Sequence, residues 1–228
     1  MRNVAVVVMA HSDDDGLVLP PKLAPIHVVI VPIWKTDAEK AEVCGAAHKI
    51  AGELRDDGLS VKVDDRDNMR PGEKYYEWER KGVPVRVELG PRDLASQSVM
   101  IKRRIAPLDA NGKPAKEKLA MDGLGVALGK VLDEFQKFLF ERALAFRDAN
   151  TVSVDTWEEF QKVFAADVSK FVWAHWDGNP ATEKSIKEAT KATIRCVPYA
   201  GQGPAVEAGK CVKSGQPSRQ RVLFAKNY

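Results

Sequence analysis

The segment from Asp64 to Arg104 contains the side chains whose types and spacing could do chemistry. It interleaves acidic and basic residues with Tyr75, Tyr76 and Trp78 around one predicted strand. A carboxylate can accept hydrogen bonds from the N1–H and 2-amino groups that only guanine presents together, arginine can donate to guanine O6 and N7, and aromatic rings can stack on bases. This mixture suits a surface that reads bases in a single-stranded RNA loop, but on composition alone an ordinary exposed face with ion pairs is favoured over it.

No other group of titratable residues predicts an active site. The run Asp13–Asp15 could bind a divalent cation, but a solvated loop before Gly16 is the better interpretation. The four histidines are far apart, with no carboxylate or cysteine at metal-ligand spacing, which argues against a metal-dependent hydrolase. The chain also lacks a phosphate-binding loop and a dinucleotide glycine fingerprint. We therefore expect no self-contained catalytic site and no metal site.

The composition predicts a folded protein but does not indicate what it binds. The 228 residues are 44% hydrophobic and 29% charged, with a net charge of +3, which excludes a disordered polymer and a membrane protein. Three widely spaced cysteines predict neither a disulfide framework nor a paired-cysteine metal site. No apolar run reaches the roughly 20 residues of a membrane span. We expect a cytoplasmic protein that does not bind membranes.

Alternating strand and helix signals predict the elements that would position the segment from Asp64 to Arg104. A strand-like run at 4–9 is followed by a proline-rich linker that ends at Pro25. Strands are then predicted at 26–33, 61–65, 84–90 and 98–105, and helices at 36–57 and 71–82. This alternation predicts an α/β layer with a largely parallel sheet.

The remaining sequence predicts a second, smaller α/β unit. Apolar residues recur every three or four positions from Leu124 to Phe146, which predicts a long amphipathic helix. Helices follow at 156–165 and 181–191, with strands at 171–176, 192–199 and 222–228 and a glycine-rich loop at 201–215.

Long strings of the sequence resemble the C-terminal half of the class II prolyl-tRNA synthetases of archaea, eukaryotes and some bacteria. They are HSDDDGLVLPPKLAPIHVVIVPI at 11–33, VDDRDNMRPGEKYYEWERKGVPVRVELGPRDL at 63–94, RALAFRDANTVSVDTWEEF at 142–160, ATIRCVP at 192–198 and FAKNY at 224–228. The resemblance covers nearly the whole chain. It implies a remnant of the class II catalytic domain and a linker at 1–25, an anticodon-binding domain with a mixed β-sheet flanked by helices at 26–108, and an α/β C-terminal domain at 109–228.

The resemblance also implies a function. Family members ligate proline to proline tRNA with ATP and Mg²⁺, and the full enzyme is expected to be a homodimer through its catalytic domain. Arg2 matches an arginine that contacts ATP, but most of the catalytic domain has no counterpart in this sequence. We therefore expect this chain to bind proline tRNA, to hold no cofactor and to be inactive in proline activation by itself.

Five residues match family positions in the anticodon-binding domain. Glu79, Arg86 and Asp93 match residues that recognise the two guanines with which proline anticodons end. Lys102 and Arg104 match a basic stretch that we assign to phosphate or base contacts. Arg66 and Lys74 are further candidates, with a structural ion pair as the alternative for Arg66.

The C-terminal domain departs from the family at its zinc site. Many members bind a structural zinc through four cysteines, and the matching positions here are Asp177, Thr182, Cys211 and Ser214. One thiolate of four is too few for a structural zinc site, so we expect this domain to fold without zinc. The terminal Tyr228 matches a family tyrosine whose carboxylate turns toward the catalytic domain, and we expect it to fray here.

A free-standing anticodon-binding-like module that binds another RNA or a protein partner is the alternative function. The segment HSDDD at 11–15 argues against this alternative, because an independent module has no use for part of a catalytic strand.

Overall fold

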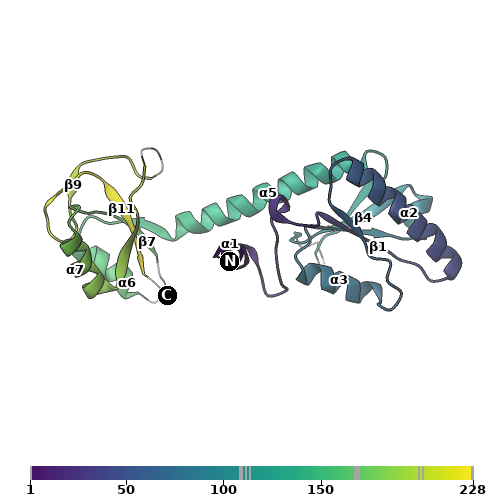
Figure 1. Cartoon of the computed structure of the whole chain (residues 1–228), viewed down its shortest axis with the longest axis horizontal. Coiled ribbons are helices and arrows are strands. Elements are labelled where there is room, and N and C mark those ends of the chain that lie inside the picture. Colours follow the sequence, from purple (N-terminus) through teal and green to yellow (C-terminus); the bar gives the residue numbers. More distant parts are fainter. Residues whose placement is uncertain are drawn as a thin grey trace. The chain divides into compact units, whose positions relative to one another are not determined.

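The computed structural model describes residues 2–107, 110, 112, 114–166, 170–199, 201 and 203–226, without the side chain of Arg2. Tyr228 lies outside the described residues. The chain divides into two compact units, Met1–Ala143 and Leu144–Tyr228. Each unit is an α/β structure, as the sequence predicts (Figure 1).

A five-stranded mixed sheet forms the centre of the first unit. Its strands are β1 (Val28–Pro32), β2 (Val61–Val63), β3 (Val85–Leu89), β4 (Ser98–Arg103) and β5 (Glu117–Ala120), in the order β2-β1-β3-β4-β5. Strand β1 is parallel to β2 and β3, whereas β4 is antiparallel to β3 and β5. The mixed sheet is confirmed, and the largely parallel arrangement holds only for its first three strands.

Helices cover both faces of this sheet (Figure 1). They are α2 (Asp37–Asp56), α3 (Pro71–Arg80), the short α4 (Pro91–Ala95) and α5 (Leu124–Ala149), with a 3-10 turn, η1, at Pro21–Leu23. Alternate residues of each strand point to opposite faces. Val28, Ile30, Val85 and Val87 therefore pack with apolar residues of α2 and α5, while Val29 and Val31 pack with Trp78 of α3 on the other face.

The opening segment is a helix, α1 (Arg2–His11), and the predicted strand at 4–9 is wrong. Its run of valines favours a strand locally. No neighbouring strand pairs with it among the described residues, and an unpaired strand would leave its backbone groups without partners. A helix satisfies most of those groups internally, and the valines of α1 lie largely in solvent.

The chain then crosses the end of α3. The Leu17 amide donates to the Arg80 carbonyl at 3.0 Å. Gly16 precedes this contact with a φ of +134°, and a Cβ there would lie 2.6 Å from the Arg80 Cα. Only glycine fits this close approach without moving the backbone.

The second unit has a four-stranded sheet covered on one face by two helices. Strands β6 (Thr151–Ser153), β7 (Phe171–His175), β8 (Ala192–Cys196) and β11 (Arg221–Lys226) lie in the order β6-β7-β11-β8. Helices α6 (Trp157–Ala165) and α7 (Pro180–Thr190) complete its core, in which Phe160 of α6 contacts Phe164 and Phe224. A small ribbon of β9 (Gly209–Lys210) and β10 (Pro217–Ser218) lies within the predicted glycine-rich loop and just beyond it.

The division between the compact units falls within α5, whereas the predicted domain boundary lies between residues 108 and 109. Strand β5 pairs with β4, and Leu124 and Leu128 of α5 pack in the core of the first unit. Of the helices that the structure describes, none is both long and apolar enough to cross a membrane.

Candidate functional site

Three of the predicted site residues meet in one ion-pair network on the α3 side of the first sheet. Arg86 lies on β3, and Lys102 is its register partner on the neighbouring β4. Both side chains reach Glu79 of α3, whose Oε1 is 2.8 Å from Arg86 Nη1 and 2.5 Å from Lys102 Nζ. Arg86 and Lys102, which lie on neighbouring strands, thus share one carboxylate oxygen of Glu79.

Glu79 is a carboxylate in this network. Burial opposes its ionisation, but the hydrogen bond from Lys102 and the charges of Lys102 and Arg86 outweigh burial and lower the pKa of Glu79. Its side chain is 26% exposed, and no described group donates to its Oε2. Glu79 therefore keeps one hydrogen-bond acceptor for a ligand.

Arg86 is the most enclosed member of the network. Its side chain is 7% exposed, and its guanidinium carbon lies 3.8 Å from the centroid of the Tyr75 ring. Arg86 Nε and Nη2 donate to Glu88 Oε1, at 3.2 and 2.8 Å. The guanidinium is thus stacked on one residue and bonded to two others.

Glu88 and Lys116 extend the network and were missed by the sequence analysis. Lys116 Nζ donates to Glu88 Oε2 at 2.7 Å. Burial opposes the ionisation of Glu88, but the bonds from Lys116 and Arg86 lower its pKa. The spacing of Arg86 and Glu88, two apart on a strand, could have placed both on one face. Nothing in the sequence indicates the contact with Lys116, which is 28 positions away.

Asp93 is not bonded to this network. It lies in α4, directly after β3, and its Oδ2 accepts the amide of Gly90 at 2.8 Å, which closes the first turn of that helix. No described group donates to Asp93 Oδ1. The structure therefore leaves Asp93 an acceptor, at the end of the strand that carries Arg86.

The side chain of Arg104 is buried in the first unit and is hydrogen-bonded there. Its side chain is 4% exposed, its Nε donates to the carbonyls of Leu17 and Glu79 at 3.0 and 2.9 Å, and its two Nη atoms donate to the carboxylate of Asp13. This places Arg104 beneath the segment that precedes η1 rather than on the RNA-contacting surface that the sequence analysis assigned to it. Asp13 is accordingly an ion-pair partner, neither a cation ligand nor simply solvated.

Arg66 and Lys74 support the fold around Asp64. Arg66 donates to Asp64 Oδ1 and Oδ2 at 2.7 Å each, and the Trp78 indole donates to Asp64 Oδ2 at 2.7 Å. Lys74 is 1% exposed and donates to the Asp64 carbonyl at 3.1 Å. For Arg66 the structural ion pair is the observed arrangement.

Three of the four positions that match the family's zinc ligands are joined by hydrogen bonds in the second unit. Thr182 Oγ1 and Ser214 Oγ both donate to Asp177 Oδ2, at 2.9 and 2.6 Å. Cys211 is buried. Two neutral hydroxyls bonded to a carboxylate do not fit a tetrahedral zinc site, which needs thiolate or imidazole ligands. Within the described ranges, no three His, Cys, Asp or Glu side chains are grouped so that they could hold a metal ion.

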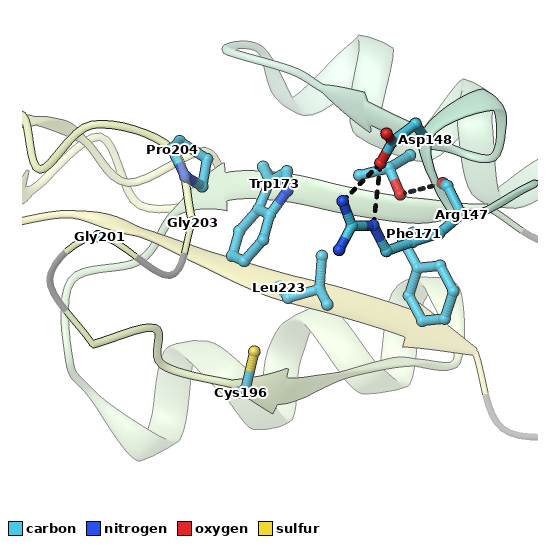
Figure 2. A pocket seen from close by; sticks show the side chains of 10 residues that line it. Arg147, Asp148, Phe171, Trp173, Cys196, Gly201, Gly203, Pro204 and Leu223 are labelled. Carbon is cyan, nitrogen blue, oxygen red and sulfur yellow. Dashed lines mark hydrogen bonds and ion pairs between the residues drawn. The ribbon is translucent and has the colours of Figure 1, made fainter. Parts of the chain in front are cut away.

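The second unit also has a cavity of about 610 Å³. Figure 2 shows its lining, with Trp173 and Leu223 from the sheet and Arg147 directed toward Asp148. Arg147 Nε and Nη2 donate to Asp148 Oδ1 at 2.9 and 2.7 Å, so the two charges at the rim neutralise each other. Cys196 lies in β8 and is exposed, at the cavity. None of the predicted site residues lines it.

Two segments of the chain match models of known protein families. Residues 27–130 match the family model described as the anticodon binding domain, and residues 157–228 match that described as prolyl-tRNA synthetase, C-terminal. Proteins named proline–tRNA ligase from Porphyromonas gingivalis ATCC 33277 and Flavobacterium johnsoniae are each 45% identical over 227 residues, covering 100% of this chain and 44% of the relative. One from Chloroflexus aurantiacus J-10-fl is 44% identical, with 45% of its length covered. The chain thus spans less than half the length of these relatives.

Proposed function

We propose that this chain recognises the anticodon of proline tRNA. Two matches support the proposal, that of residues 27–130 to the anticodon binding domain and that of residues 157–228 to the C-terminal domain of prolyl-tRNA synthetase. The observation that carries the proposal is the network of Glu79, Arg86 and Lys102 on one face of the sheet. These three side chains lie within the anticodon-binding match and come from three different elements.

The network offers the groups that guanine requires. The unbonded Oε2 of Glu79 can accept from guanine N1–H or the 2-amino group, and the guanidinium of Arg86 can donate to O6 and N7. Adenine has an amino donor where guanine has O6, so it would place a donor against Arg86. Asp93 Oδ1 is a second acceptor at the end of the same strand, available to the second guanine.

Lys102 has a different part in the proposal. Its side chain is 17% exposed, and its ammonium, which lies at Glu79, can contact RNA as a point charge. We assign it to a phosphate. Arg104 is left out of the base-reading set because its donors are bonded within the protein.

The test uses the anticodon stem-loop of proline tRNA and the same stem-loop with each anticodon guanine changed to adenine. Glu79→Gln keeps the shape of the side chain and removes its charge. One good bidentate base contact contributes roughly 1–3 kcal/mol. The variant should therefore bind the guanine stem-loop about tenfold more weakly, measured by fluorescence anisotropy, and discriminate less between the two RNAs.

Glu77→Gln is the matched control. Glu77 lies on the same helix but pairs with Arg66 and Lys81, so its variant should bind both RNAs as the wild type does. Equal affinity of the wild-type chain for the guanine and adenine stem-loops would show that the network does not read the anticodon.

We also assign the chain to a proline–tRNA ligase that uses ATP and Mg²⁺ and acts as a homodimer. The described side chains offer no cluster for a metal ion, so no chemical step is assigned to them. The chain by itself should give no proline-dependent ATP–pyrophosphate exchange. Exchange clearly above a no-enzyme control would contradict the expectation that the chain is inactive by itself.

A further inference from the structure

The guanidinium of Arg86 is fixed on one face and on two of its sides. The Tyr75 ring lies against one face, Glu88 accepts from Nε and Nη2, and Glu79 accepts from Nη1. Burial, followed by the charge of Glu88, raises the pKa of Tyr75, which keeps its hydroxyl protonated.

These bonds use three of the five N–H donors of the guanidinium. One N–H on Nη1 and one on Nη2 have no acceptor among the described residues. Two neighbouring donors of this kind match the two acceptors, O6 and N7, of a guanine. A free arginine has many rotamers and loses that freedom when it binds a base, whereas an arginine held beforehand has already lost it.

We propose that Tyr75 and Glu88 are positioning residues that determine specificity for guanine by holding the guanidinium of Arg86 with two donors open to the base. This rests on the proposed function, since it presupposes that Arg86 reads an anticodon guanine. Neither residue is required to touch the RNA. Glu88 fixes the rotation of the guanidinium in its own plane, and the Tyr75 ring fixes the orientation of that plane.

A purely structural role for Tyr75 makes a different prediction. The ring packs beside the apolar cluster between α3 and the sheet, so its loss could loosen the whole face. Loosening would weaken the binding of every RNA by the same factor. Loss of positioning would weaken mainly those RNAs that offer N7 to Arg86.

The experiment compares guanine with 7-deazaguanine, which lacks the N7 acceptor, at each anticodon guanine of the stem-loop. In the wild-type chain, 7-deazaguanine should lower affinity about tenfold at the position that Arg86 reads. In Tyr75→Leu, the guanine stem-loop should lose about tenfold in affinity and the 7-deazaguanine stem-loop less than threefold, so that the discrimination largely disappears. Tyr75→Phe keeps the ring and should stay within threefold of the wild type.

Two further variants serve as a control and as a second test of positioning. Tyr199→Leu changes a tyrosine of the second unit, which is 80% exposed, and should leave both affinities unchanged. Glu88→Gln keeps the shape of the side chain and should reduce the discrimination as Tyr75→Leu does, even if Tyr75→Leu fails to fold. In the free protein, the Arg86 Nε–Hε NMR signal should carry a ring-current shift that Tyr75→Phe retains and Tyr75→Leu loses.

The outcomes separate the two levels of the argument. If the wild-type chain does not distinguish guanine from adenine, the proposed function fails and this inference fails with it. If it distinguishes guanine from adenine but not from 7-deazaguanine, only this inference fails. If the wild type discriminates and Tyr75→Leu or Glu88→Gln discriminates equally well, only the positioning role is overturned. An equal loss of affinity for both RNAs in the folded variants would likewise overturn it.

Discussion

Replacing Asp64 with asparagine should destabilise the first unit in a way that depends on pH. The Asp64 side chain is 1% exposed, and its carboxylate accepts from Arg66 and Trp78. Burial opposes its ionisation, but the hydrogen bonds from Arg66 and Trp78 outweigh burial and lower the pKa of Asp64 from 3.8 to about 2. At about 1.4 kcal/mol per pKa unit, the ionised carboxylate contributes about 2 kcal/mol to the free energy of unfolding at pH 7.

The sign of the pH dependence follows from the lowered pKa. Between about pH 4 and pH 2 the unfolded chain binds a proton at Asp64 that the folded chain does not, so acid removes this stabilisation. The wild type should therefore exceed Asp64→Asn by about 2 kcal/mol at pH 7, and the difference should shrink as the pH falls through this window. Urea unfolding at several pH values, followed through the amide signals of β1 and β3, measures the difference.

Asp67→Asn provides the control for a surface charge. Asp67 is 64% exposed in its pair with Lys40, and exposed pairs of this kind contribute roughly 0–1 kcal/mol. The reasoning about Asp64 is refuted if Asp64→Asn unfolds within about 0.5 kcal/mol of the wild type at pH 7, taking the usual error of such measurements. A difference that stays constant down to pH 2 would refute it as well.

Three other changes test separate parts of the structure. Arg104→Met should cost about 2–4 kcal/mol of stability in urea unfolding, because loss of the buried guanidinium leaves the Asp13 carboxylate and two carbonyls unpaired. The folded variant should keep its RNA affinity within about twofold. Weaker RNA binding at unchanged stability would instead support an RNA-contacting role for Arg104. Asp177→Ala should lower the stability of the second unit by about 2–3 kcal/mol, because its carboxylate loses three hydrogen bonds, from Asn179 N, Thr182 Oγ1 and Ser214 Oγ. A strong chelator should leave the wild-type melting temperature unchanged. Near-stoichiometric zinc by elemental analysis, with a lower melting temperature after chelation, would contradict this. Gly209→Ala should destabilise the second unit by about 1–3 kcal/mol in thermal melts, because the added Cβ would collide with the buried ring of His175. The control Gly52→Ala, whose added Cβ meets no atom within 4 Å, should be neutral or stabilising by up to about 1 kcal/mol. Equal effects of the two substitutions would contradict the collision.

The sequence predicted those elements whose apolar pattern is long enough to be unambiguous. The buried strands β1 and β3 and the amphipathic α5 lie close to their predicted ranges. Strand β5 was missed because the sequence Glu117–Ala120 is short and half polar, and only its pairing with β4 makes it a strand. Helix α1 was predicted wrongly because local β-propensity was given more weight than the need for a pairing partner.

The candidate site was predictable in its residue types and less so in its contacts. Glu79, Arg86 and Lys102 came from family positions, and the structure brings them together. The internal position of Arg104 depends on a segment 91 residues earlier in the chain that packs over it. No local pattern encodes a contact of that sequence separation. Arg104 and Lys102 therefore look equivalent in the sequence and are not equivalent in the fold.

The sharing of one Glu79 oxygen by two cations has a consequence for the thermodynamics of RNA binding. In this cluster three cations, Arg86, Lys102 and Lys116, pair with two carboxylates, Glu79 and Glu88. The cluster therefore has a net charge of about +1. The condensed counterions lie on the RNA, and a cluster with so small a net charge neutralises few phosphates and therefore releases few of them. The logarithm of the binding constant should then fall with the logarithm of salt concentration with a slope of only about −0.7 per net phosphate neutralised. Affinity at this site would persist at ionic strengths that dissociate a purely basic RNA-binding patch.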